Sequence, residues 1–389
     1  MKGHIRERSP GHWAIVIDVR DSQTGKRKRR WHSFKGTKRE AQIECARLLT
    51  VIKNGTSVDA TRMTVAAYLE HWLAHKQMRV SPRSHENYAE VIRQLNPLIG
   101  TILVAKLKPA EVAGAYSRAL ESGRRDGQGG LSARSVHTMH RILSQALKQA
   151  VRWQLITRNP CDAVTPPRVE RKPMTVLDAA GTIAMLDAAR GQAMFVPIML
   201  GVLCGLRRGE VAALCWRDVN LDAARLSITQ SVEQLNRDGG AIRLKPPKSG
   251  RGRTVALPAL AVEELRAHRL RQAENLLRLG VRQSDETHVC LQPNFQPWPP
   301  RNLSSSFVKF MKVSGLPRVR LHDLRHSHAT QLLAANVHPK VVQERLGHAN
   351  IATTMDLYTH VMPGMQDEAA SRVDAALRTA LRQGRGKKG

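Results

Sequence analysis

An alternation of apolar and polar residues over positions 13–20 (WAIVIDVR) is the first periodic pattern in the chain. A period of two is typical of a half-buried β-strand. A Thr-Gly turn separates this segment from residues 26–34, which predict a second strand and therefore a β-hairpin. Thr37 then precedes apolar residues at helical spacing and can cap a helix that runs to about residue 53.

Helical periodicity dominates the segment from residue 63 to residue 162. Its apolar residues recur every three or four positions, which is typical of amphipathic helices that pack into a bundle. The polar segment before it and the proline-rich segment TPPRVERKP after it show no apolar period, so both are predicted to be linkers. The predicted helices lie around residues 65–72, 88–99, 112–120 and 133–154.

Beyond residue 179 helices dominate again, but three β-type runs interrupt them: LSITQSV, AIRLKP and RTVALP. This pattern predicts a mostly helical domain with one small antiparallel sheet. A last apolar stripe at helical spacing over residues 366–381 predicts a tail helix. Two arrangements are open for that helix: it packs on its own domain, or it docks on a neighbouring subunit.

These elements predict a multidomain α+β protein. A small β-hairpin or sheet with one helix comes first, an all-α bundle follows, and a mostly α domain with a small antiparallel sheet comes last. The length of 389 residues agrees with several domains, because a single hydrophobic core rarely grows so large. The predicted boundaries are residues 1–57, 62–164, a linker over 165–174, and 175–389.

The formal net charge of +30 makes a polyanion the expected partner, because lysine and arginine recur along the whole chain. The longest apolar stretch, residues 195–206, is about half of the roughly 20 residues that a membrane span needs, so no membrane partner is expected. The five cysteines form no C-x-x-C pair, and the N-terminus has no signal-type apolar region. We therefore expect a cytoplasmic protein without a bound metal or cofactor.

Basic side chains are densest on the predicted hairpin and recur on the outer faces of the bundle. A solvated charged face is the plain interpretation, but a hairpin can enter the major groove of DNA, which favours a DNA contact. The candidate DNA-binding residues are Lys26, Arg27, Lys28, Arg29, Arg30, Lys35, Lys38 and Arg39 in the first domain, and Arg134 and Arg141 in the bundle.

Two candidate site residues lie at changes of backbone direction. Arg207 stands in GLRRGE, between a helix stop at Gly205 and the next helix, and Glu210 could hold it by a charge-assisted hydrogen bond. Lys248 stands in the turn PPKSG between two predicted strands, where a long side chain can reach outward. Taken alone, each is more often an ordinary surface cation.

In LHDLRHSHATQLL, the residues His322, Arg325 and His326 share one side of a predicted helix. Two histidines four residues apart also occur in zinc sites, but Asp rather than Glu follows His322 and no third ligand accompanies the pair. Farther on, His348 follows a helix-ending glycine, and Tyr358 lies on the next short helix. A tyrosine in such a place is ordinarily a packing residue.

The order of these motifs resembles the tyrosine recombinase (phage integrase) family: GLRRGE, PKSG before RTVALP, HDLRH, LGH and then TTMDLYTH. The resemblance is close over residues 175–364. Upstream, residues 63–162 look like the family's core-binding bundle, and residues 11–54 resemble its three-stranded arm-binding domain, of which two strands are predicted here. By this resemblance, the residues around the scissile phosphate are Arg207, Lys248, His322, Arg325 and His348, and Tyr358 is the nucleophile.

The resemblance implies an integrase of a phage or other mobile element, which cuts and rejoins DNA through a 3′-phosphotyrosine bond without metal or ATP. Its implied partners are double-stranded attachment sites and three further copies of itself on synapsed DNA, with an excisionase and a DNA-bending host protein as further candidates. It would act in the bacterial cytoplasm, at the nucleoid. The alternatives are a type IB topoisomerase and a catalytically silent DNA-binding regulator; the basic hairpin and the complete set of site residues favour the recombinase.

Overall fold

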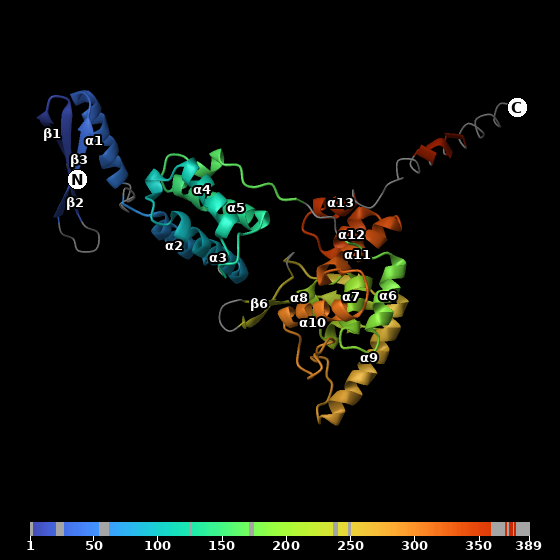
Figure 1. Cartoon of the computed structure of the whole chain (residues 1–389). Coiled ribbons are helices and arrows are strands. Elements are labelled where there is room, and N and C mark those ends of the chain that lie inside the picture. Colours follow the sequence, from blue (N-terminus) through green and yellow to red (C-terminus); the bar gives the residue numbers. More distant parts are fainter. Residues whose placement is uncertain are drawn as a thin grey trace. The chain divides into compact units, whose positions relative to one another are not determined.

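The computed structural model describes residues 3–20, 27–53, 62–124, 126–170, 175–235, 240–247, 250–358, 370–371, 373–375 and 377–378. The chain divides into two compact units, Met1–Arg171 and Lys172–Gly389 (Figure 1). The described parts are mostly helical and contain small antiparallel sheets, which confirms the predicted α+β fold class.

The first unit begins with a three-stranded antiparallel sheet in the order β1-β2-β3, followed by one helix. β2 and β3 are the two strands of the predicted hairpin. β1 (GHIRERS) was not predicted from periodicity, because Ile5 is the one large apolar residue in it. The elements are β1 (Gly3–Ser9), β2 (His12–Arg20), β3 (Arg27–Lys35) and α1 (Lys38–Lys53).

One face of this sheet packs on α1. Ile15 and Ile17 of β2 are fully buried and form a small core with Cys45 of the helix. The Glu40 carboxylate accepts a hydrogen bond from the Thr37 backbone N at 2.8 Å, and this contact stabilises the start of α1. The predicted helix start at Thr37 is therefore confirmed.

The rest of the first unit is a helical bundle. Thr64, Ser81 and Ser132 cap its main helices by accepting backbone N–H groups with their side-chain oxygens. Tyr68 is buried in the bundle core, and its Oη donates to the carbonyl of Ala146 at 2.5 Å. The elements are α2 (Val65–Lys76), α3 (Pro82–Ile99), η1 (Val104–Lys106), α4 (Pro109–Ser122), α5 (Ala133–Arg152) and η2 (Pro160–Ala163).

The second unit is built around α7, which is apolar on every side and almost entirely buried. α11 packs directly against α7, and Leu324 contacts Gly201 so closely that an added Cβ would lie 3.2 Å from it. The helices of this unit are α6 (Ala179–Ala189), α7 (Phe195–Cys204), α8 (Arg208–Ala213), η3 (Trp216–Asp218), α9 (Ala259–Arg278), α10 (Pro300–Val313), α11 (Leu321–Ala334), α12 (Pro339–Leu346) and α13 (Ala352–Tyr358). Wherever the chain is described, its helices are too short or too polar to cross a membrane.

In the described residues of this unit, two antiparallel sheets take the place of the single small sheet that was predicted. The run LSITQSV divides into two strands, because Val232 buries its side chain against Ala212 and Ala213 of α8 instead of continuing the first sheet. One sheet has the order β4-β5-β8, and the other is the hairpin β6-β7. The strands are β4 (Val219–Asn220), β5 (Arg225–Ile228), β6 (Ser231–Gln234), β7 (Ile242–Lys245) and β8 (Arg253–Ala256).

Candidate active site

Arg207 lies at the junction of α7 and α8, where Gly205 ends α7 in the left-handed conformation with φ +68°. Arg207 is the N-cap residue of α8, and Glu210 occupies the third position of that helix. The Glu210 carboxylate accepts hydrogen bonds from the Arg207 backbone N at 2.9 Å and from its Nη1 at 2.8 Å. Glu210 therefore stabilises the start of α8 and orients the guanidinium at the same time.

Arg325 is a buried arginine on α11, with 2 % of its surface exposed. Its Nη1 donates to the carbonyl of Gly205 at 2.5 Å, and its Nη2 donates to the carbonyl of Leu346. Burial, followed by the positive charge of Arg207, lowers the pKa of Arg325 to about 8. The charge of Glu210 raises this pKa but does not offset the effect of burial, so an incoming anion would be attracted to Arg325.

The last turn of α12 gathers three guanidinium groups. The C-terminal carbonyls of a helix lack partners within the helix and carry partial negative charge, so cations bind there. Arg253 Nε donates to the carbonyl of Arg345 at 2.8 Å, Arg325 Nη2 to that of Leu346, and Arg207 Nη2 to that of Gly347 at 2.7 Å. We refer to Arg207, Arg253 and Arg325 as the arginine cluster.

Arg253, the first residue of β8, was not predicted from the sequence. Its Nη1 and Nη2 bind the two oxygens of Glu210 at 2.9 and 2.7 Å. Although burial acts in the opposite direction, the hydrogen bonds and charge of Arg253, and then of Arg207, lower the pKa of Glu210 to about 2. Glu210 is thus a carboxylate shared by two arginines, and the only local signal for this in the sequence is the position of Arg253 next to a turn.

His322 and His348 lie close enough to Arg207 and Arg325 for these charges to affect both imidazoles. Burial, and then Arg325, lower the pKa of His348 to about 3. His322 keeps an exposed edge, but the protein around its base, the neighbouring His326 and Arg325 lower its pKa to about 4. Both rings are therefore neutral near pH 7 in the DNA-free protein.

The surroundings of His348 are defined by the end of α12. Gly347 ends that helix in the left-handed conformation, with φ +63°, and the chain turns into the segment before α13. His348 Nδ1 lies 2.9 Å from Thr354 Oγ1 on α13. If Nδ1 accepts the hydroxyl proton, Nε2 carries the ring hydrogen and is a donor.

Two predicted site residues lie wholly or partly outside the described residues. Tyr358 is the last residue of α13, which packs against α11 and α12, but its side chain lies outside the described residues. Lys248 lies outside them altogether, between β7 and β8. The side chains of Arg207, His322, Arg325 and His348 are described, and the structure brings these four together.

The described side chains of the site carry an excess of positive charge. Glu210 faces two guanidinium groups at once, and the two hydrogen bonds of Arg325 described above both go to carbonyl oxygens. Asp323 lies nearby on α11, but its carboxylate binds the Arg320 backbone N at 2.8 Å and the Arg320 guanidinium. This balance suits an anionic ligand such as a phosphodiester.

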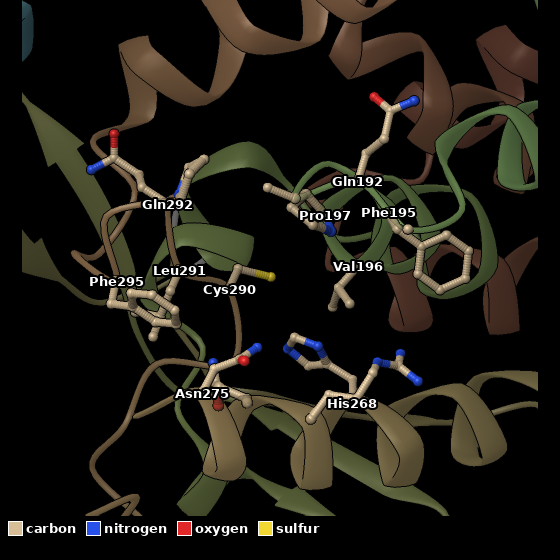
Figure 2. A pocket seen from close by; sticks show the side chains of 15 residues that line it. Gln192, Phe195, Val196, Pro197, His268, Asn275, Cys290, Leu291, Gln292 and Phe295 are labelled. Carbon is tan, nitrogen blue, oxygen red and sulfur yellow. The ribbon is translucent and has the colours of Figure 1, made fainter. Parts of the chain in front are cut away.

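A cavity of about 340 Å³ lies elsewhere in the second unit. Figure 2 shows Phe195, His268 and Cys290 lining it from three separate segments. His268 Nε2 lies 2.8 Å from the carbonyl of Val289, so this polar group holds the cavity wall together. The lining includes none of the predicted catalytic residues, and the cavity is therefore distinct from the arginine cluster.

The predicted DNA-binding residues of the first domain have different surroundings. Lys35 is exposed on β3, and Lys38 and Arg39 are exposed in the first turn of α1. Arg29 is also exposed, and its Nε lies 3.3 Å from Asp18. Outside the described residues lie Lys26 and the side chains of Arg27, Lys28 and Arg30.

The sheet face that points away from α1 contains further candidates that sequence patterns missed. Arg6 and Arg8 of β1 and Trp31 of β3 are exposed on this face, together with Lys35. The Arg8 guanidinium lies 5.8 Å from the centre of the Trp31 ring, and Trp31 is 55 % exposed. An exposed aromatic ring among cations is typical of a nucleic-acid surface.

The bundle has a broad basic groove of about 960 Å³. Arg141, which was predicted to contact DNA, lines it together with Arg83, His140 and Lys148. Arg134 is exposed on the same helix, α5, but does not line the groove. The groove therefore gathers cations from α3 and α5 on one side of the bundle.

Comparison with known families gives two matches. The sequence profile of the phage integrase family matches residues 175–364, and that of its N-terminal SAM-like domain matches residues 64–118. A tyrosine recombinase XerC-like protein from Caldanaerobacter subterraneus is 25 % identical over 383 residues, which cover 93 % of this chain and 96 % of the relative.

Solved structures with the same fold include two integrases. The Tn1549 transposon integrase in complex with circular intermediate DNA is 19 % identical with a TM-score of 0.67, and the match covers 80 % of this chain and 99 % of that one. A lambda integrase tetramer bound to a Holliday junction is 18 % identical with a TM-score of 0.53, covering 89 % and 95 %. These likenesses show that the chain shares its fold with solved integrases.

Proposed function

Since this chain belongs to the phage integrase family of tyrosine recombinases, which break and rejoin DNA strands, we propose that Arg207 and Arg325 bind the scissile phosphate and Tyr358 attacks it. The protein is then a site-specific DNA recombinase of a phage or another mobile element. The observation that carries the residue assignment is the convergence of the arginine cluster on the last turn of α12, next to His348.

The arginines suit the charge changes of this reaction. A phosphodiester is anionic, and its non-bridging oxygens gain charge in the transition state, so fixed cations lower the barrier. A guanidinium has five N–H donors, and one that is held by two or three protein acceptors retains donors for phosphate oxygens. His348 adds a neutral donor, because its Nδ1 faces Thr354 and its Nε2 is left for the phosphate.

The covalent step exchanges one phosphoester for another. The Tyr358 Oη–P bond forms while the bond from phosphorus to the 5′-oxygen breaks, which leaves a 3′-phosphotyrosine and a free 5′-hydroxyl. The phenol proton passes to a base, for which we propose His322, and the leaving oxygen takes a proton from Lys248. A 5′-hydroxyl from another strand reverses these steps. ATP is not required because the phosphotyrosine bond conserves the energy of the broken linkage, and we propose no metal because the guanidinium groups stabilise the charge on the phosphate.

DNA binding is proposed for both parts of the first unit. The exposed cations of the sheet would contact arm-type sites, and the basic groove of the bundle would contact the core site. The predicted boundaries, residues 1–57 for the arm-binding domain, 62–164 for the core-binding domain and 175–389 for the catalytic domain, remain part of this proposal.

Assembly as a homotetramer on synapsed DNA is also proposed, supported by the lambda integrase tetramer on a Holliday junction. Within residues 366–381, the described positions 370–371, 373–375 and 377–378 are helical, and Val373 and Leu377 are 60 % and 59 % exposed. We propose that this tail helix docks on a neighbouring subunit. Truncation after Gly364 should then abolish cooperative assembly, and assembly that survives truncation would contradict the proposal.

Further partners and the place of action follow from the substrate. An excisionase and a DNA-bending host protein are proposed as accessory factors that set the direction of recombination. The substrate is chromosomal and element DNA, so the enzyme would act in the cytoplasm, at the nucleoid.

Covalent trapping tests the proposed function directly. Purified protein is incubated in EDTA with nicked duplexes from the DNA that flanks its own gene, and the products are run on a denaturing gel. We expect a protein–DNA band that survives SDS and disappears in Tyr358→Phe. Tight binding without that band would favour the silent regulator, and relaxation of supercoiled DNA without strand exchange would favour the topoisomerase.

A further inference from the structure

Arg253 is one of the least accessible charged side chains at the site. It begins β8, where it pairs with Ile228 of β5, and its side chain is 8 % exposed, against 20 % for that of Arg207. A buried guanidinium destabilises a protein unless its charge and its N–H groups find partners. The hydrogen-bond partners of Arg253 should therefore indicate its role at the site.

These partners belong to two other elements. Nη1 and Nη2 form a bidentate pair with Glu210 of α8, and Nε donates to the carbonyl of Arg345 at the end of α12. The guanidinium thus joins β8, α8 and α12. A planar fork with this geometry cannot be replaced by the single ammonium of lysine without losing at least one of these contacts.

Arg253 also lies next to the groups that hold two residues which face the phosphate in the proposed mechanism. Glu210 binds the Arg207 guanidinium with the same oxygen, Oε1, that accepts from Arg253 Nη1. Gly347, which precedes His348, lies against Arg253: an added Cβ would be 3.0 Å from its Cδ and 3.1 Å from its Nη1. Arg253 therefore supports both Arg207 and the turn that carries His348.

We propose that Arg253 is a positioning residue for strand cleavage. Arg253 and Arg207 both bind the Glu210 carboxylate, so Glu210 orients the Arg207 guanidinium without neutralising its charge. Arg253 also holds the end of α12, which precedes His348. Its three guanidinium nitrogens all bind protein acceptors and its side chain is less exposed than that of Arg207, so we assign it a role through Arg207 and His348 rather than on the phosphate. This inference rests on the proposed function.

The test compares Arg253→Lys and Arg253→Met with Arg225→Met, which removes an exposed arginine at the other end of the same sheet. Single-turnover cleavage of a nicked duplex and the Kd for the same duplex are measured for the full chain. We expect cleavage at saturating DNA to slow about 100-fold in Arg253→Met and about 10-fold in Arg253→Lys, since displacements near 1 Å have effects of this size. The Kd should change less than about twofold, because Arg253 does not touch DNA, and Arg225→Met should cleave like the wild type.

A double variant separates positioning from a general structural role. If Arg253 acts through Glu210, Glu210→Gln combined with Arg253→Met should slow cleavage much less than the product of the two single effects. The inference is overturned if Arg253→Lys cleaves at the wild-type rate, or if the double variant slows cleavage by the product of the two single effects. It is also overturned if the cleavage rate of each variant falls only in proportion to its folded fraction, measured by circular dichroism. Should Arg253→Met fail to fold, the rate of Arg253→Lys decides. If the wild-type protein formed no covalent complex with the nicked duplex, the proposed function itself would be refuted.

Discussion

Arg325 Nη1 donates a hydrogen bond to the carbonyl of Gly205 at 2.5 Å, although 120 residues separate the two in the chain. Gly205 ends α7 two residues before Arg207, so this bond connects the elements that carry the two proposed phosphate-binding arginines. The position of one arginine therefore depends on the other, and the phosphate site forms only when α7 and α11 are packed together.

The first prediction concerns the geometry of Arg325. Arg325→Lys keeps the charge but cannot reach the carbonyls of Gly205 and Leu346 while also binding a phosphate. We expect cleavage to slow by about 10²–10³-fold, the usual effect of removing a transition-state donor. Covalent complex formation measures this, with Arg320→Lys, an exposed arginine just before the same helix, as the control. Equal loss in both variants would contradict a specific role.

The second prediction concerns the shared carboxylate. The pKa of Glu210 is lowered from its ordinary value of 4.5 to about 2, so its ionised form stabilises the fold. By linkage this contribution, about 3 kcal/mol, is complete above about pH 4.5 and is lost as the pH falls toward 2. Urea unfolding should show Glu210→Gln to be destabilised near pH 7, with a flatter pH dependence between these limits. If the free energy of unfolding of the wild type and of Glu210→Gln changed with pH in parallel, the prediction would be refuted.

The third prediction concerns the turn before His348. Gly347→Ala places a Cβ 3.0 Å from Arg253 in a left-handed backbone with φ +63°. Gly315→Ala is a matched control, because φ is +69° there and nothing lies within 4 Å of the added Cβ. Both variants should lose about 1–2 kcal/mol of stability from backbone strain, but only Gly347→Ala should also slow cleavage. Thermal unfolding and covalent trapping measure the two effects.

The fourth prediction concerns the protonation of the histidines. The pKa values of His322 and His348 are lowered to about 4 and about 3, so neither ring should titrate between pH 5 and 8 in NMR spectra of the DNA-free protein. Because the unfolded chain takes up these protons near pH 6.5, the two neutral rings favour the folded state fully above that pH, and this stability is lost as the pH falls toward about 4 for His322 and about 3 for His348. A titration midpoint above pH 6 for either ring would contradict the described surroundings.

The fifth prediction concerns the exposed face of the N-terminal sheet. Arg8→Gln and Lys35→Gln should each weaken DNA binding and reduce the slope of log K against log salt by about 1, as expected for the loss of one phosphate contact. Trp31→Ala should weaken binding without changing the slope, because it removes an uncharged contact. Fluorescence anisotropy over a range of salt concentrations measures both quantities, and unchanged binding in all three variants would exclude this face.

Local patterns in the sequence were sufficient for much of the fold. The cap at Ser132, the helix stop at Gly205 and the hairpin of β2 and β3 all follow from residues that lie within a few positions of one another. β1 was missed because its inward side is largely without apolar residues. The single predicted sheet became two because contact with α8, which periodicity does not report, separates β6 from β5.

By itself, the sequence determined the candidate chemistry: the residue types of the motifs around Arg207, Arg325, His348 and Tyr358, and their order, because each motif is local. Only the tertiary structure decided how these groups are held. A pattern of side chains does not predict which backbone carbonyls bind the arginine cluster at the end of α12. Nor does it predict that Arg253 binds Glu210, which lies 43 residues away in the chain. Such convergence depends on how helices and strands pack, since packing brings together groups that no short-range periodicity connects.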